Sequence, residues 1–156
     1  MSNFILGARS LNELQGVNAS LVAVVQRAIQ LTAVDFAVID GVRTLAEQRE
    51  YVRTGASQTI ASRHLTGHAV DLAPFVGNTV RWELALMYPI ALAMRQAARE
   101  SGVPLRWGGC WSPELTNSDE LPEDMVADYV ARRRAAGLRA FVDAGHYELP
   151  AAQYPG

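Results

Sequence analysis

Three residues with metal-binding side chains stand in two short motifs that are far apart in the chain. His64 and Asp71 belong to the first motif, and His146 belongs to the second. Two imidazoles and one carboxylate can fill three corners of a tetrahedral zinc site and leave the fourth for water, which is the arrangement of a catalytic zinc. These residue types therefore indicate hydrolytic metal chemistry, provided that the fold brings the three side chains together.

The separation of His64 and Asp71 in the sequence excludes a single regular element between them. In one helix the two backbones would stand about 10 Å apart, whereas ligand atoms on one zinc lie within roughly 4 Å of each other. In one strand, an odd separation would turn the two side chains to opposite faces. A turn at Thr66 and Gly67 brings them together, because glycine tolerates positive φ. We therefore expect Asp71 on a strand over residues 69–73.

Two other interpretations of these residues stay open from spacing alone. A lone histidine or aspartate is commonly a hydrogen-bonded structural residue rather than a ligand. His64 and His68 also stand four residues apart, as the histidines of the helical His-Glu-x-x-His zinc motif do. Against that motif, this chain has Leu65 in place of the required glutamate, and Gly67 weakens a helix at this point.

Taken together, the two motifs resemble the signature of the M15 family of zinc peptidases. The first reads Ser-x-His-x-x-Gly-x-Ala-x-Asp over residues 62–71, and the second reads Asp-x-x-His-Tyr-Glu-Leu over residues 143–149. Asp-Gly-Val-Arg-Thr at residues 40–44 and Trp-Gly-Gly-Cys-Trp at residues 107–111 resemble further landmarks, particularly of the branch of phage L-alanyl-D-glutamate endolysins. The resemblance spans about residues 36–149, nearly the whole chain.

The resemblance implies a function and assigns roles to the matching residues. It implies that His64, Asp71 and His146 bind Zn²⁺, that Asp143 is the general base, and that Arg43 stabilises negative charge on the substrate. The implied reaction is hydrolysis of the L-Ala-D-Glu amide bond of peptidoglycan stem peptides during phage-induced host lysis. Alternatives are a D-Ala-D-Ala carboxypeptidase or dipeptidase of cell-wall metabolism, and a peptidoglycan-binding relative that has lost catalysis.

Some of the assigned roles have competitors in the sequence itself. Ser62 can bind substrate or orient a ligand, or it can simply cap a turn. Arg43 can also be read as a surface arginine that pairs with a nearby glutamate. Glu148 competes with Asp143 for the role of base, because in a strand it shares a face with His146. The family pattern makes Glu148 a supporting residue that is hydrogen-bonded to a ligand imidazole.

Two further residues qualify the resemblance. Cys110 stands where the family often has an acidic residue, which puts in doubt any contact built on that acid but leaves the ligand set intact. Asp143 has a shorter reach than the glutamate found there in some relatives. We expect Gly145 to compensate by letting the backbone approach the metal more closely.

Length and composition favour one compact domain. The chain has 156 residues, of which 49% are hydrophobic, and this suffices for a sizeable core but leaves no room for a separate cell-wall-binding domain. We therefore expect residues 1–156 to form a single catalytic domain. The charges nearly balance, with 14 Lys and Arg against 16 Asp and Glu, so no strong field for nucleic acid follows. We expect the stem peptide as partner, no nucleic acid, no membrane insertion and a monomer.

Cysteine content and the N-terminal residues bear on where the protein is made and acts. The single cysteine, Cys110, excludes an internal disulfide and fits folding in a reducing cytoplasm. Residues 1–9 lack the apolar run of a signal peptide, and no stretch approaches the roughly 20 apolar residues of a membrane span. We expect synthesis in the host cytoplasm and action on the cell wall after another protein permeabilises the membrane.

Apolar periodicity and capping residues predict an α+β fold, a small antiparallel sheet flanked by helices. Capping boxes are expected at Ser10 and Thr44, and Pro89 is expected to kink or divide a long helix. The tail over residues 150–156 is expected to be poorly ordered. Helices are expected within residues 10–32 and over 45–54, 82–101 and 122–136, and strands over 34–39, 69–73, 105–107 and 146–149.

Overall fold

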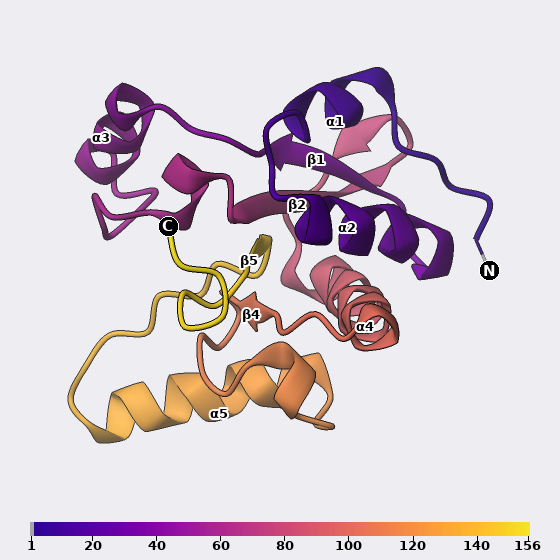
Figure 1. Ribbon diagram of the computed structural model, residues 1–156. Coiled ribbons are helices and arrows are strands. Elements are labelled where there is room, and N and C mark those ends of the chain that lie inside the picture. The colour runs from indigo at the N-terminus through magenta and orange to yellow at the C-terminus, as the bar shows by residue number, and fades with distance from the viewer. Residues whose placement is uncertain (1) are drawn as a thin grey trace.

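An antiparallel sheet runs through the centre of the computed structural model, which describes residues 2–156 (Figure 1). Its strands are β1 (Phe36–Asp40), β2 (Ala69–Val76), β3 (Thr79–Val80), β4 (Arg106–Trp107) and β5 (His146–Glu148). The order is β1-β2-β5-β4, and β3 pairs with β2 outside this path. The long strand β2 lies between β1 and β5, so it joins segments from both halves of the chain.

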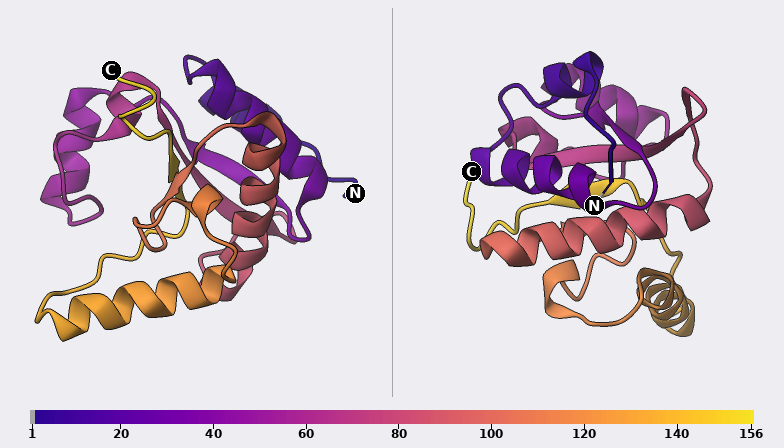
Figure 2. Two further views of the ribbon diagram at one scale, coloured as in Figure 1. Left: turned by 60° about the horizontal axis from the view of Figure 1, so that its bottom comes forward. Right: turned by 90° about the vertical axis from the view of Figure 1, so that its right-hand side faces the viewer.

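The helices cover this sheet and extend beyond it. Helix α4 lies between the sheet and α5, and α2 packs against α4 (Figure 2). Helix α3 lies at the opposite end of the molecule from α5 (Figure 1). The described chain contains α1 (Ala8–Glu13), α2 (Ala19–Leu31), α3 (Leu45–Arg53), α4 (Leu84–Ser101), α5 (Pro122–Ala135) and the 3₁₀ helices η1 (Arg63–Thr66) and η2 (Leu115–Asn117). The predicted α+β class with a small antiparallel sheet is confirmed.

Local sequence signals explain where several helices begin. The capping box predicted at Thr44 is present: its hydroxyl accepts from the Glu47 N–H at 3.1 Å, and the Glu47 carboxylate accepts from the Thr44 N–H at 3.0 Å. The box predicted at Ser10 is wrong, because α1 begins earlier, at Ala8. The buried Ser10 hydroxyl instead accepts a hydrogen bond from the Val38 N–H of β1 at 2.9 Å.

The core forms where the apolar faces of α2 and α4 meet the sheet. Pro89 does not divide α4, which runs as one helix from Leu84 to Ser101. Trp107 of β4 and Tyr147 of β5 stack with their ring centroids 6.5 Å apart and carry the core across the sheet. The largest fully buried apolar side chains are Trp107, Tyr147, Leu21, Leu72, Ile90, Met94, Leu105, Leu115 and Leu149.

The C-terminal segment is held against the protein, so the prediction of a poorly ordered tail is wrong. The Arg63 guanidinium donates to the carbonyl of Leu149 at 3.0 Å and to that of Tyr154 at 2.6 Å. Tyr154 also donates its backbone N–H to the Pro150 carbonyl at 2.9 Å and packs against the core. None of the helices in residues 2–156 combines the length and apolar character needed to cross a membrane.

Candidate metal centre and active-site cleft

Three elements that are distant in the sequence position the predicted ligands. His64 lies on η1, Asp71 on β2 and His146 on β5. Helix η1 ends at Gly67, whose φ of 76° is the positive value that the predicted turn requires. Asp71 then pairs with His146 in the antiparallel register of β2 and β5. The predicted turn and the predicted strand through Asp71 are both confirmed.

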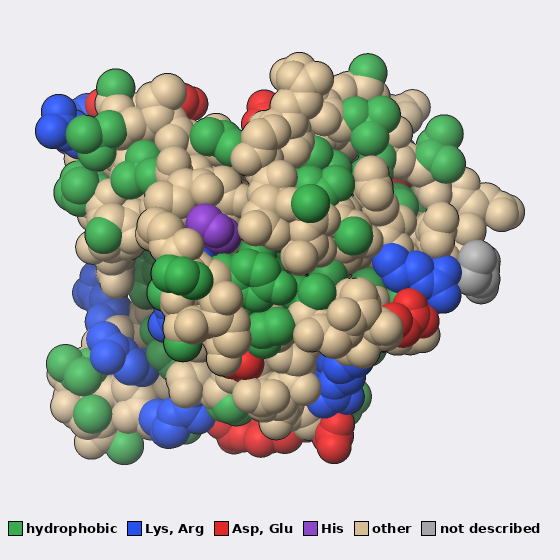
Figure 3. All heavy atoms as spheres, in the orientation of Figure 1, with side chains coloured by type: hydrophobic (Ala, Val, Ile, Leu, Met, Phe, Trp, Pro, Cys, Tyr) green, Lys and Arg blue, Asp and Glu red, His purple; other side chains and the backbone are tan. Residues whose placement is uncertain are grey.

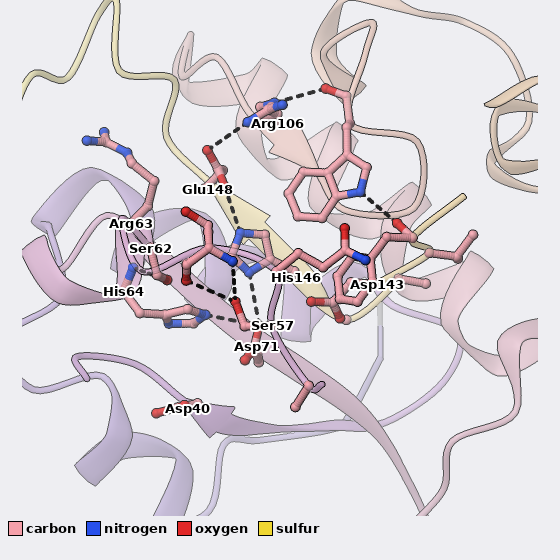
Figure 4. A pocket seen from close by; sticks show the side chains of 18 of the residues that line it. Asp40, Ser57, Ser62, Arg63, His64, Asp71, Arg106, Asp143, His146 and Glu148 are labelled. Carbon is pink, nitrogen blue, oxygen red and sulfur yellow. Dashed lines mark hydrogen bonds and ion pairs between the residues drawn. The ribbon is translucent and has the colours of Figure 1, made fainter. Parts of the chain in front are cut away.

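The ligand atoms of the three residues converge on one point (Figure 4). His64 Nε2 and His146 Nδ1 each lie 3.2 Å from Oδ1 of Asp71. All three ligand atoms lie within 4.8 Å of one another. Both imidazoles are buried, whereas the Asp71 side chain is 25% exposed and opens into a cleft of about 1300 Å³. The fold therefore unites the predicted triad at an accessible position.

The hydrogen bonds of His64 show that this triad fits a cation. Its Nδ1 lies 2.8 Å from the Gly41 carbonyl, and because a carbonyl can only accept, Nδ1 carries the proton. The lone pair of Nε2 then faces the Asp71 carboxylate. This buried nitrogen has no hydrogen-bond partner among residues 2–156. Buried polar atoms are rarely left unsatisfied, and a divalent cation between the imidazole and the carboxylate would satisfy both.

His146 is oriented in a similar way, by a carboxylate. Its Nε2 lies 2.8 Å from Oε1 of Glu148, which leaves Nδ1 for the centre. Burial alone would lower the pKa of His146, but its hydrogen bonds to Asp71 and Glu148 outweigh burial and raise the pKa to about 10. Burial likewise raises the pKa of Asp71, and the two histidines more than reverse this and hold it low. Without metal the imidazole of His146 thus keeps a proton on Nδ1, and a bound cation would replace this proton.

Arg43 is buried beside this centre, and it is not a surface arginine. Its Nε donates to Asp40 Oδ2 at 2.8 Å, one terminal nitrogen donates to Gln48 Oε1 at 2.6 Å, and the other donates to Asp71 Oδ2 at 3.0 Å. The Tyr51 ring lies 4.2 Å from the guanidinium carbon. Arg43 therefore fixes the second oxygen of Asp71, so that Oδ1 is directed toward the imidazoles.

The partners of Arg43 are residues of the site region that the sequence motifs did not indicate. Asp40 is the last residue of β1 and pairs with Asp71 across the sheet. Gln48 is fully buried, and its amide nitrogen donates to Ser57 Oγ at 2.9 Å and to the Thr59 carbonyl at 2.5 Å. Gln48 thereby connects Arg43 to the loop that walls the cleft. The only sequence signal for this network was the presence of two opposite charges, Asp40 and Arg43, within residues 40–44.

Asp143 and Ser62 also line the cleft. Asp143 precedes β5 and is half-buried, and its backbone carbonyl accepts from the His146 N–H at 3.1 Å. Burial, and after it the negative charge of Asp71, raises the pKa of Asp143 to about 6. Ser62 caps η1, because its hydroxyl accepts from the His64 N–H at 3.2 Å. Both residues are therefore placed where they can meet a substrate.

Two other residues considered at the sequence level lie outside the triad. The His68 ring faces Thr66, with 2.7 Å between Nδ1 and the threonine hydroxyl, and it does not line the cleft. Cys110 is buried, and its thiol donates to the Pro113 carbonyl at 3.6 Å. Burial raises the pKa of the Cys110 thiol, so the uncharged form that does not bind metal is favoured.

Gly145 lies where the strand that carries His146 meets the strand that carries Asp71. A Cβ at this position would stand 2.5 Å from the Leu72 carbonyl, too close for any real contact. We expect Gly145→Ala to cost about 1–3 kcal/mol of unfolding free energy and to weaken metal binding, because β2 and β5 must move apart at the ligands. Urea unfolding and a zinc titration measure the two effects. Gly7→Ala is the control, since a Cβ there meets nothing within 4 Å.

Arg43→Ala is expected to destabilise the protein as well as to impair its activity. Removing the guanidinium leaves the carboxylates of Asp40 and Asp71 without their buried cation, which typically costs about 3–5 kcal/mol. Arg43→Lys should recover part of this loss, because lysine keeps the charge but lacks the planar fork that reaches three acceptors. Urea unfolding checks both variants. Arg49→Ala on the exposed face of α3 is the control, and an equal effect there would contradict the expectation.

Buried imidazoles and a carboxylate that meet at the wall of an open cleft define a candidate hydrolytic metal centre. Comparison with known proteins gives the particular family. The profile described as phage L-alanyl-D-glutamate peptidase matches residues 1–130, so the chain belongs to this family. The matched segment ends before β5, and the fold brings His146 of that strand to His64 and Asp71, as the motif at residues 143–149 predicted.

Individual relatives agree with the family assignment. The chain is 30% identical over 151 residues to the L-alanyl-D-glutamate peptidase of Escherichia phage T5, covering 94% of this chain and 98% of the relative. It is 32% identical over 84 residues to that of Listeria phage A118, covering 54% of this chain and 29% of the relative. The crystal structure of the Serratia marcescens L-Ala D-Glu endopeptidase ChiX is similar, with 37% identity, a TM-score of 0.75, and coverage of 99% of this chain and 96% of that one.

Proposed function

We propose that this protein is a zinc-dependent peptidase that hydrolyses the L-Ala-D-Glu amide bond of peptidoglycan stem peptides. The observation that carries the proposal is the approach of His64 Nε2 and His146 Nδ1 to the same oxygen of Asp71, 3.2 Å from each, at the wall of an open cleft. The names of the T5, A118 and ChiX relatives support the choice of bond.

His64, Asp71 and His146 are the residues that would hold the zinc ion. A zinc ion held there supplies a Lewis acid and lowers the pKa of water to about 7. Glu148 keeps the His146 ring oriented through its hydrogen bond to Nε2, and Arg43 keeps the Asp71 carboxylate oriented through Oδ2. These supporting contacts hold the ligand atoms in place before substrate enters.

Asp143 is the proposed general base. Its carboxylate takes a proton from the attacking water and returns that proton to the departing amine nitrogen. A carboxyl group with a pKa of about 6 is largely ionised at neutral pH and is a stronger base than an ordinary aspartate. Arg43 adds positive charge beside the centre, which favours the negative charge that develops on the substrate. Ser62 is proposed to bind the substrate backbone from the cleft wall.

The proposed biological role is lysis of a bacterial host. The relatives from phages T5 and A118 support this role. We propose that the protein is made in the host cytoplasm as a monomer, and that it reaches the cell wall after another protein permeabilises the membrane.

Digestion of purified peptidoglycan tests the proposed function. The expected products carry a new N-terminal D-Glu, which mass spectrometry of the released fragments identifies. Removing metal with a chelator should abolish release, and added Zn²⁺ should restore it. Release of D-Ala in place of a new D-Glu terminus would contradict the proposed bond. Binding to peptidoglycan without any new amino group would contradict the proposed catalysis.

A further inference from the structure

The cleft contains more positive charge than the metal centre uses. Four arginines line it: Arg43, Arg63, Arg106 and Arg133. Figure 3 shows arginine side chains, in blue, at the left edge of the molecule, where the surface is hollowed between α3 and α5. A cleft that binds a neutral substrate does not need an accessible cation. The hydrogen bonds of each arginine therefore show which of the four could bind a negatively charged group of the substrate.

The guanidinium groups of Arg43 and Arg63 are hydrogen-bonded within the protein. Arg43 is buried, and all three of its nitrogens donate to side chains of the protein. Arg63 donates to the carbonyls of Leu149 and Tyr154 and so holds the C-terminal segment. Arg133 donates through Nε to the Arg139 carbonyl, and in the part of the chain described no hydrogen bond or ion pair joins it to the metal centre.

Arg106 differs because it is both accessible and connected to the centre. Its side chain is 42% exposed, and its NH1 donates to Oε2 of Glu148 at 3.3 Å (Figure 4). The other oxygen of Glu148 accepts from His146, so Arg106 lies one side chain away from a metal ligand. An anion bound to Arg106 would therefore lie beside the reacting centre.

The guanidinium of Arg106 is held in a fixed orientation by Trp111. Its Nε donates to the Trp111 carbonyl at 3.0 Å, and its central carbon lies 5.2 Å from the indole ring. Trp111 has a φ of 63°, which is rare for a bulky residue and marks a constrained backbone. The indole N–H donates to the Phe141 carbonyl at 2.8 Å, and the ring lies 5.3 Å from that of His146.

Some donors of this fixed guanidinium are left for a ligand. Nε and one N–H of NH1 are used, whereas NH2 has no hydrogen bond to any residue in 2–156. The NH1–NH2 edge of an arginine matches the two oxygens of a carboxylate. Trp111 and Glu148 thus hold the guanidinium of Arg106 in a fixed orientation, in which its remaining N–H groups can bind the carboxylate of a ligand at the β4 wall of the cleft.

We propose that Arg106 is a specificity-determining residue that binds the free carboxylate of the substrate's glutamyl residue. This inference rests on the proposed function. A glutamyl residue has two carboxyl groups, and the continuing peptide uses only one of them. The other stays negatively charged within a few bonds of the scissile nitrogen, so it enters the cleft together with the bond that is cleaved.

A purely supporting role for Arg106 makes a different prediction. If Arg106 only held Glu148 in place, its loss would disturb His146 and would slow every substrate equally. If Arg106 binds the glutamyl carboxylate, its loss affects only substrates that carry this charge. Two stem peptides that differ only at this group, with a carboxylate in one and a carboxamide in the other, separate the two roles.

The experiment compares kcat/KM for both peptides in zinc-loaded wild type, Arg106→Gln, Arg106→Lys and Arg134→Gln. Wild type should prefer the carboxylate peptide. Arg106→Gln should lose roughly tenfold to a hundredfold on that peptide, the size of a hydrogen bond to a charged group, and less than about threefold on the carboxamide. Arg106→Lys should recover part of the preference. Arg134 is exposed on α5 outside the cleft, so its variant should match wild type.

The outcomes separate this inference from the proposed function. Equal losses on the two peptides in Arg106→Gln, or a wild type without preference, would overturn the carboxylate subsite while the peptidase activity stands. A lower zinc content in Arg106→Gln that explains its whole loss would also overturn it. A zinc-loaded wild type that cleaves neither peptide would overturn the proposed function, and the assignment of Arg106 with it.

Discussion

Asp143→Asn will lower kcat by about 10²–10⁴-fold while the zinc content and the unfolding free energy stay close to those of wild type. The amide has nearly the shape of the carboxylate but cannot accept the proton of the attacking water. Asp143 is not one of the three converging ligands, so its substitution leaves the metal centre intact. Turnover of a stem peptide, measured together with bound zinc and a urea unfolding curve, checks the three parts of this expectation.

Glu148→Gln is the matched comparison, because it changes the other carboxylate that flanks His146. Glu148 Oε1 lies 2.8 Å from Nε2 of His146, on the side of the ring that faces away from Asp71. We expect this variant to bind zinc roughly 10–100-fold more weakly and to regain activity in excess zinc. If zinc-loaded Asp143→Asn remains active and zinc-loaded Glu148→Gln is inactive, the two roles must be exchanged.

The acid limb of the pH–rate profile should report the same carboxyl group. A base works when it is deprotonated, so kcat/KM should fall as the pH drops through the pKa of Asp143. Burial and the charge of Asp71 raise that pKa from 3.8 to about 6, and a bound cation lowers it again. The midpoint of the acid limb is therefore expected between pH 3.8 and about pH 6. An activity that stays constant down to pH 3.8 would exclude Asp143 as the base.

Alanine in place of either ligand histidine should abolish zinc binding at concentrations that saturate wild type. Each of His64 and His146 is proposed to supply one of three protein ligands, so its loss should weaken binding by more than the roughly 10–100-fold typical of a supporting residue. Activity should disappear with the metal. Zinc content after gel filtration and a competition titration with a chromogenic chelator measure the effect.

His68→Ala is the control for these two variants. His68 belongs to the same motif as His64, but its ring contacts Thr66 and lies outside the cleft. The variant should keep its zinc and its activity. Full zinc occupancy in His64→Ala would contradict the ligand assignment, and so would loss of zinc in His68→Ala.

The sequence by itself determined the parts of the site that depend on near neighbours. The step from His64 to Asp71 requires a sharp reversal, and Gly67 adopts the positive φ that this reversal needs. The capping box at Thr44 forms because its two partners stand three residues apart on one helix. These features follow from backbone sterics and local hydrogen bonds, so a motif that contains the right residues is sufficient to predict them.

Only the tertiary structure decided which buried polar groups meet. The resemblance gave Arg43 a role at the site but not the partners of its donors, which are Asp40, Gln48 and Asp71 from three different elements. Ser10 has the sequence of a helix cap, but its hydroxyl binds the backbone of β1 instead. A buried donor must find an acceptor wherever packing places one. That choice depends on the register of the whole sheet, so no local pattern in the sequence contains it.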